Sequence, residues 1–151
     1  MLSVRQAEDA GLTPAAIAGR VRAGQLLRDL SGVLRAADHP VTPRSRIRAA
    51  MLSLGDEATL VGRSGAYWWR IIDVAPAEIQ VAVPHGSRPR RRPGVRIVRR
   101  AADPVDRVIV DGVAVTKKPA TVLTAATSSG LVAGASCACR SRQVDHAATD
   151  P

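Results

Sequence analysis

The sequence predicts an α+β fold in two small units, residues 1–40 and 41–127, followed by a disordered tail over residues 128–151. Two Thr-Pro pairs each mark a helix start, because threonine caps the first turn and proline loses no hydrogen bond there. Elsewhere, short runs of apolar residues alternate with period two, which is typical of strands. One Asp-Gly pair, Asp111-Gly112, stands between two such runs and predicts a hairpin turn.

The first unit begins with two predicted short helices joined by a tight turn. The first helix covers residues 4–10, and the second covers residues 14–23 and stops at a glycine. Ile17 and Val21 lie four residues apart on the buried side of the second helix, and Arg20 lies off that side. Two short helices joined in this way form a helix-turn-helix, whose second helix fits the major groove of DNA.

The stretch after the second helix predicts two short strands around a Ser-Gly turn, which is the position of a wing. We therefore predict base contacts from Arg20 and Gln25, and phosphate contacts from Arg22, Arg28 and Arg35. The alternative is a helical subdomain that presents this face to protein or solvent. The predicted DNA-binding residues of this winged helix-turn-helix unit are Thr13, Ala15, Ala16, Gly19, Arg20, Arg22, Gln25, Arg28 and Arg35.

The second unit predicts a small antiparallel sheet with helices. One helix begins at Thr42-Pro43, and another over residues 63–71 contains the adjacent aromatic residues Tyr67, Trp68 and Trp69. Three neighbouring rings cannot all share one helix face, so we interpret the triplet as packing. Residues 79–83 predict a strand of this sheet.

The last predicted elements are a hairpin over residues 108–115 and a short helix over residues 121–126. From residue 128 onward Ser, Gly, Ala and Thr dominate and the periodicity disappears. Such a segment cannot bury enough apolar surface to offset its ordering entropy, so we expect disorder there.

Positive charge is concentrated in one part of the chain. The sequence has 22 Lys+Arg against 13 Asp+Glu, a net charge of +9, which favours an anionic partner. Seven arginines and no acid lie between the strand at 79–83 and Ala101. We predict that Arg90, Arg91 and Arg92 occupy a hairpin turn and bind a phosphate backbone. The alternative is a solvated loop that only keeps the protein in solution.

Enzyme, metal and membrane functions find little support. The three histidines are far apart, and no phosphate-binding glycine loop, GxSxG or CxxC motif is present, so we predict no enzyme, cofactor or metal. Cys137 and Cys139 are too close for an easy disulfide and indicate a reducing cytoplasm. The N-terminus predicts no signal peptide, and the uncharged stretch 119–139 is too polar to predict a membrane span.

Five segments follow one another in a recognisable order: AEDAGLTPAAIAGRVRAGQLLRDLSGVLRAA, RSGAYWWRI, IQVAVP, RPGVRIVR and VIVDGVAVTKKPATVLTAA. Over residues 4–126 the chain thereby resembles the AbiEi-like family of bacterial antitoxins and transcriptional regulators. The resemblance implies a winged helix-turn-helix followed by a small α+β module. It also implies repression of the protein's own operon and a nucleotidyltransferase toxin of a type IV system as partner.

The chain departs from the family pattern in three places. Gly32-Val33-Leu34 stands where the family has Gly-Val-Tyr, and Thr124 takes an acidic position. Residues 128–151 match nothing of the family's second domain, so we expect a truncated copy. We predict a cytoplasmic, sequence-specific regulator that binds double-stranded DNA and is of the antitoxin type. The alternative is a protein-interaction module, or a remnant that binds a toxin or partner protein without binding DNA.

Overall fold

The structure of the protein is a computed structural model, which describes residues 1–87, 91–99 and 104–128. The described residues form five α-helices, one short 3-10 helix and eight strands, which are arranged in two sheets. The predicted α+β class is confirmed. The tail predicted to be disordered lies outside the described residues, apart from its first residue.

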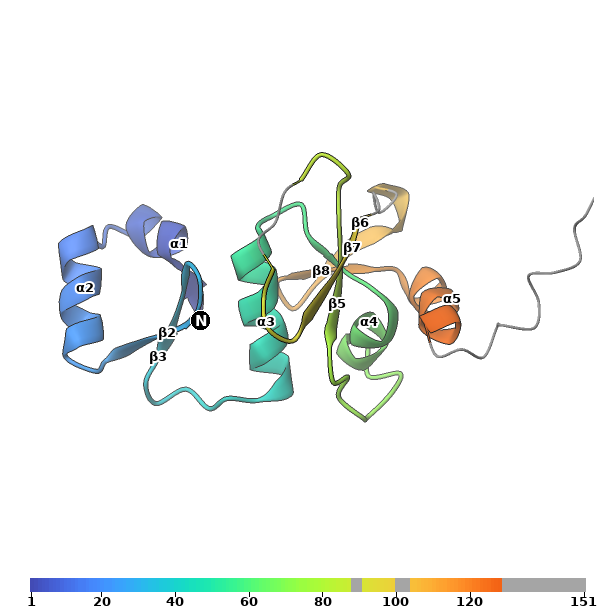
Figure 1. Ribbon diagram of the computed structural model, residues 1–151, viewed down its shortest axis with the longest axis horizontal. Helices are drawn as coiled ribbons and strands as arrows, with labels where there is room; N and C mark the ends of the chain where they lie inside the picture. Colours follow the sequence, from blue (N-terminus) through green and yellow to red (C-terminus); the bar gives the residue numbers. More distant parts are fainter. Residues whose placement is uncertain (88–90, 100–103, 129–151) are drawn as a thin grey trace, which may run out of the picture.

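The N-terminal unit packs two short helices against a three-stranded antiparallel sheet of order β1-β3-β2 (Figure 1). Its elements are β1 (Leu2–Ser3), α1 (Val4–Asp9), α2 (Pro14–Arg22), β2 (Leu26–Leu30) and β3 (Val33–Ala36). The two helices and the β2–β3 hairpin were predicted. Strand β1 was not, because two residues are too few to show a period.

Local capping explains why the two helices begin where they do. Ser3 and Gln6 form a capping box at the start of α1, and the Thr13 hydroxyl accepts a hydrogen bond from the Ala16 amide at 3.2 Å. These bonds satisfy amides that the first helical turn leaves free. Gly24 follows α2 with a φ of +71°, a conformation that favours glycine and ends the helix.

The second unit is built on a five-stranded sheet of order β6-β5-β4-β8-β7. Helix α3 lies on one side of this sheet, and α4 and α5 lie on the other (Figure 1). Its elements are α3 (Pro43–Leu54), β4 (Thr59–Leu60), α4 (Gly62–Trp68), β5 (Ile79–Val83), β6 (Val95–Arg99), the 3-10 turn (Pro104–Asp106), β7 (Arg107–Val110), β8 (Val113–Thr116) and α5 (Lys118–Ser128).

The prediction of a purely antiparallel sheet is wrong, because the sheet is mixed. The pairs β4–β5 and β7–β8 are antiparallel, but β4–β8 and β5–β6 are parallel. Alternating apolar residues show which face of a strand is buried and carry no information on strand direction. Leu60 pairs with Val115 far along the chain, a pairing that no local pattern reports.

The predicted hairpin at the arginine run is also wrong. Since β5 and β6 are parallel neighbours, a tight hairpin cannot connect them. Parallel neighbours need a crossover of about a dozen residues, whereas a tight hairpin joins only antiparallel strands. Arg91 and Arg92 therefore lie in the last part of a crossover, at residues 91–94 directly before β6, which we call the crossover segment. Arg90 lies outside the described residues.

The predicted hairpin turn and the packing of the aromatic triplet are confirmed. Asp111 and Gly112 both have positive φ, at 49° and 72°, as a type I′ turn requires. Trp68 is 2% exposed and its indole N–H donates to the Val110 carbonyl oxygen at 3.0 Å. The indole N–H of Trp69 donates to the Thr116 carbonyl oxygen at 2.8 Å. Both rings thus tie α4 to the strands on either side of the turn.

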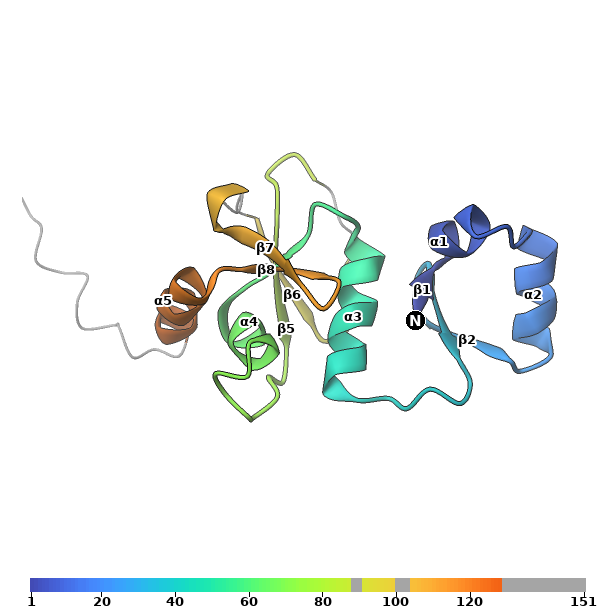
Figure 2. The same ribbon diagram turned by 180° about the vertical axis from the view of Figure 1, so that it is seen from behind.

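Helix α3 lies between the N-terminal unit and the second sheet, as Figure 2 shows from behind. It contacts all three strands of the first sheet and also β5, and its Ile47, Ala50 and Met51 belong to the second core. Leu30 of β2 packs against this same core.

The predicted boundary at residue 40 falls just before α3 and stays a prediction. No helix in the described part of the chain is long and apolar enough to cross a membrane.

Candidate nucleic-acid interface

Helix α2 presents one buried and one exposed side. Ile17 is 2% exposed and packs in a core with Ala7 and Leu34, and Val21 packs against this core. Arg20 is exposed, as the helical spacing predicted. The other predicted contact residues on this side of the unit are exposed, except that Gly19 is half-buried: they are Thr13, Ala15, Ala16, Gly19, Arg22 and Gln25.

Small residues surround Arg20 on the exposed side of α2. A Cβ placed on Gly19 would meet nothing within 4 Å, so the space above this position is open. Ala15 and Ala16 add only methyl groups at the start of the helix. A helix surface of this kind lets its axis approach the floor of a groove closely, while one long cationic side chain reaches further in.

The β2–β3 hairpin is anchored to both helices. The Gln25 amide donates to the Arg20 carbonyl oxygen at 2.9 Å, which joins the end of α2 to the hairpin. The Val4 amide donates to the Gly32 carbonyl oxygen at 2.8 Å, which holds the hairpin turn against the start of α1. Arg28 is exposed on β2, next to a register shift. The hairpin therefore has a fixed place relative to α2.

Arg35 occupies a different environment from the other predicted phosphate ligands. Its side chain is buried, and its Nε lies 2.9 Å from both carboxylate oxygens of Asp29. Its Nη1 also donates to the His39 carbonyl oxygen at 2.6 Å. The guanidinium thus joins the hairpin to the segment that leads toward α3. A phosphate contact from Arg35 stays a prediction.

Residues 91–93 of the crossover segment lie beside the β2–β3 turn. An open hollow of about 480 Å³ separates the two and is lined by Arg28, Asp29, Leu30, Ser31, Gly32, Arg91, Arg92 and Pro93. The structure thus brings Arg28 together with Arg91 and Arg92, although they are far apart in sequence. Arg20 does not line this hollow. The remaining predicted residue of the run, Arg90, lies outside the described residues.

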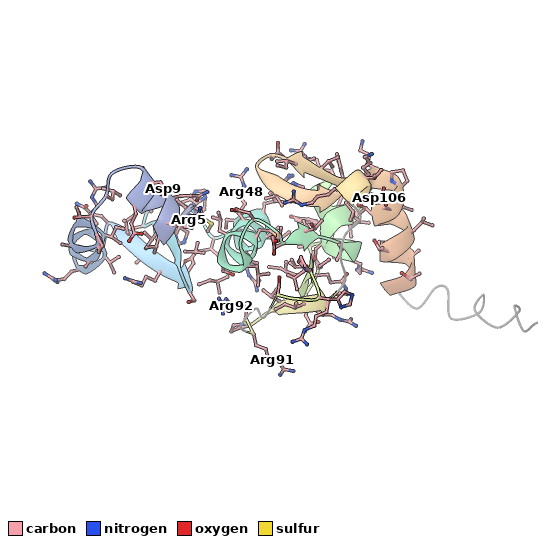
Figure 3. All side chains as sticks on the ribbon, turned by 90° about the horizontal axis from the view of Figure 1, so that it is seen from above. Arg5, Asp9, Arg48, Arg91, Arg92 and Asp106 are labelled. Atoms are coloured by element: carbon pink, nitrogen blue, oxygen red, sulfur yellow. The ribbon has the colours of Figure 1, made fainter. Side chains whose placement is uncertain are left out.

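Two further arginines, which sequence reasoning did not single out, have a structural role on α3. Arg44 stacks over the Trp68 ring at 4.2 Å and forms an ion pair with Asp111 at 3.2 Å. Arg48 donates to the Asp111 carbonyl oxygen at 2.9 Å. In Figure 3, Arg48 and Arg92 lie on opposite sides of α3, and Arg91 projects away from the protein on the side of Arg92. Arg44 and Arg48 thereby hold α3 to the β7–β8 turn.

The described residues contain no group of three or more His, Cys, Asp or Glu side chains placed to hold a metal ion. No protein-family model and no curated protein matches this chain. The family resemblance given by the order of its segments therefore stays an expectation.

Proposed function

We propose that the protein is a sequence-specific regulator that binds double-stranded DNA, with α2 in the major groove and the β2–β3 hairpin as a wing. The observation that carries the proposal is the exposed side of α2, where Arg20 stands among Ala and Gly residues. A helix with this surface fits the width of the major groove, and an arginine can bind a guanine through two parallel hydrogen bonds.

The arrangement around α2 supports a winged helix-turn-helix. A short helix precedes α2, a hairpin follows it, and the order β1-β3-β2 places the N-terminal strand beside β3. In the described part of the chain, none of Arg20, Arg22 and Arg28 has a carboxylate partner. Their charge is therefore available to the phosphates that supply most of the affinity of such proteins for DNA.

The resemblance to the AbiEi-like family extends the proposal to a target and a partner. We propose that the protein acts in the cytoplasm on the promoter of its own operon, as an autorepressor of the antitoxin type. A nucleotidyltransferase toxin is the partner that this resemblance implies. The net charge of +9 is consistent with a nucleic-acid target for this chain.

The test is an electrophoretic mobility shift of the full chain with the DNA upstream of its own gene, against a scrambled duplex of equal length. Arg20→Ala is expected to cost about 1–3 kcal/mol on the preferred duplex and to relax the preference at one base pair. Arg22→Ala is the matched control in the same helix. It is expected to weaken binding to both duplexes equally, because a phosphate contact carries no sequence information.

Two results would contradict the proposal. Equal affinity of the unchanged protein for the upstream and scrambled duplexes would remove sequence specificity. No shift with any duplex at low salt would leave the protein-interaction module as the better account of this fold.

A further inference from the structure

We propose that the hollow between the β2–β3 turn and the crossover segment is a second binding site for the phosphodiester backbone of DNA. The DNA would then contact both units of the protein rather than the N-terminal unit alone. This inference rests on the proposed function, because the ligand is the same duplex that α2 would bind. It adds a site on the second unit that the helix-turn-helix does not require.

The charge of the lining favours an anion. Arg28 comes from the hairpin, and Arg91 and Arg92 come from the crossover. Asp29 is the one acid among the described lining residues, and the guanidinium of Arg35 at 2.9 Å balances its charge. Arg28 and Arg91 are both exposed, so their guanidinium groups are accessible to a ligand. The hollow is therefore a place of net positive charge between two units.

Both walls of the hollow are fixed by backbone hydrogen bonds. On one side, the Gly32 carbonyl oxygen accepts from the Val4 amide at 2.8 Å. On the other, the Val95 amide donates to the Arg92 carbonyl oxygen at 3.1 Å, and the Ile79 amide donates to the Gly94 carbonyl oxygen at 2.8 Å. A site whose walls are already ordered loses less conformational entropy when a ligand binds.

The chemistry of the lining favours a phosphodiester over a protein segment. Guanidinium groups match the geometry of phosphate oxygens and bind them through parallel hydrogen bonds. Among the described residues of the lining, Leu30 and Pro93 are the only apolar ones, which leaves little surface there for the aromatic or aliphatic anchor of a protein partner. The hollow also shares Arg28 with the proposed wing, and the strand that carries Arg28, β2, contacts α2.

The test compares Arg28→Ala, Arg91→Ala and the double variant in the full chain, by the dependence of DNA affinity on salt. Each single change is expected to reduce the slope of log affinity against log salt by about 0.9, the value of one phosphate contact. Because both arginines would hold the same stretch of backbone, their effects on affinity should not be additive. Sequence preference should stay unchanged in all three variants.

Lys117→Ala is the matched control. It removes the same unit of charge at an exposed position directly before α5. Figure 1 shows α5 on the side of the second sheet that faces away from the N-terminal unit. The slope of log affinity against log salt for Lys117→Ala should equal that of the unchanged protein. Thermal midpoints of all variants, measured by circular dichroism, confirm that the exposed substitutions leave the fold intact.

The outcomes separate this inference from the proposed function. Specific DNA binding with an unchanged slope in Arg91→Ala would overturn the second site and leave the proposed function standing. If the loss of DNA affinity in the double variant equals the sum of the two single losses, the two arginines do not share one site, and the second site is overturned while the proposed function stands. Absence of DNA binding by the unchanged protein would overturn both proposals. Binding of polyglutamate that Arg91→Ala abolishes, together with no effect of Arg91→Ala on DNA binding, would assign the hollow to an acidic protein instead.

Discussion

The two units of the protein differ in how much buried surface supports them. The N-terminal unit has a core of three buried residues, Ala7, Ile17 and Leu34, with half-buried side chains around it. The second unit has a larger core, in which eleven of its described residues are buried, Trp68 and Leu60 among them. Regions with few buried apolar contacts open locally at lower free energy than large cores do. The surface proposed to bind DNA is thus carried by the smaller of the two cores.

Matched leucines give the sharpest test of this difference. Leu34 and Leu60 are both fully buried, one in each core. Replacement of either by alanine is expected to cost about 3–5 kcal/mol, from lost transfer free energy and the cavity that remains. Leu34→Ala should increase hydrogen exchange within residues 2–36 far more than elsewhere. Leu60→Ala should lower protection across β4, β5 and β8, and urea denaturation with hydrogen-exchange mass spectrometry measures both effects.

Global loss of protection in Leu34→Ala would contradict the comparison. It would mean that α3 couples the two cores so tightly that they unfold together. Leu30 packs against the second core and would then be the first contact to examine.

The ion pairs of the two units offer a smaller contrast. Asp29 and Arg35 have side chains that are 21% and 10% exposed, whereas Asp111 and Arg44 are 60% and 30% exposed. Asp29→Asn leaves a buried guanidinium without its counter-charge and is expected to cost about 1–3 kcal/mol. Asp111→Asn keeps a residue that tolerates positive φ and should cost less than about 1 kcal/mol. Urea denaturation of both variants measures the free energy of unfolding. A larger loss of stability in Asp111→Asn than in Asp29→Asn would contradict this prediction.

Two helical glycines provide the smallest effects, and these should be opposite in sign. A Cβ on Gly65 would lie 3.0 Å from Cγ2 of Thr121, a fully buried side chain held by its own hydrogen bonds. Gly65→Ala should therefore destabilise the protein by about 1–3 kcal/mol through overpacking. Gly19→Ala meets open space and should stabilise it by about 0.5–1 kcal/mol, because alanine loses less entropy in a helix. Thermal unfolding of the two variants measures whether each change lowers or raises the stability of the protein.

Structural features that depend on a few adjacent residues, such as helix caps and tight turns, could be predicted from the sequence. Thr13 and Thr42 cap helices that begin at the following prolines, and Asp111-Gly112 turns a hairpin, because each depends on a few adjacent residues. The mixed sheet could not be predicted in the same way. Its parallel pairs join Leu60 to Val115 and Ile79 to Val95, residues that are not neighbours in the sequence.

The candidate site shows the same limit. The exposure of Arg20 followed from helical spacing, but the approach of Arg91 to Arg28 has no local signal, because the residues come from different units. The pairing of Arg35 with Asp29, in contrast, could have been predicted from the sequence. Asp29 and Arg35 stand on the two strands of one short hairpin, and opposite charges on paired strands often meet.

The exposed side of α2 can accept other side chains, because open space surrounds it. Gly19 meets no neighbour, and Ala15 and Ala16 are exposed, so side chains at these positions do not support the core. New side chains can be introduced there at little cost to stability, since surface substitutions away from special features usually change it by less than about 0.5 kcal/mol. A small library at these three positions, with Arg20 kept, is therefore a short route to variants that select other DNA targets.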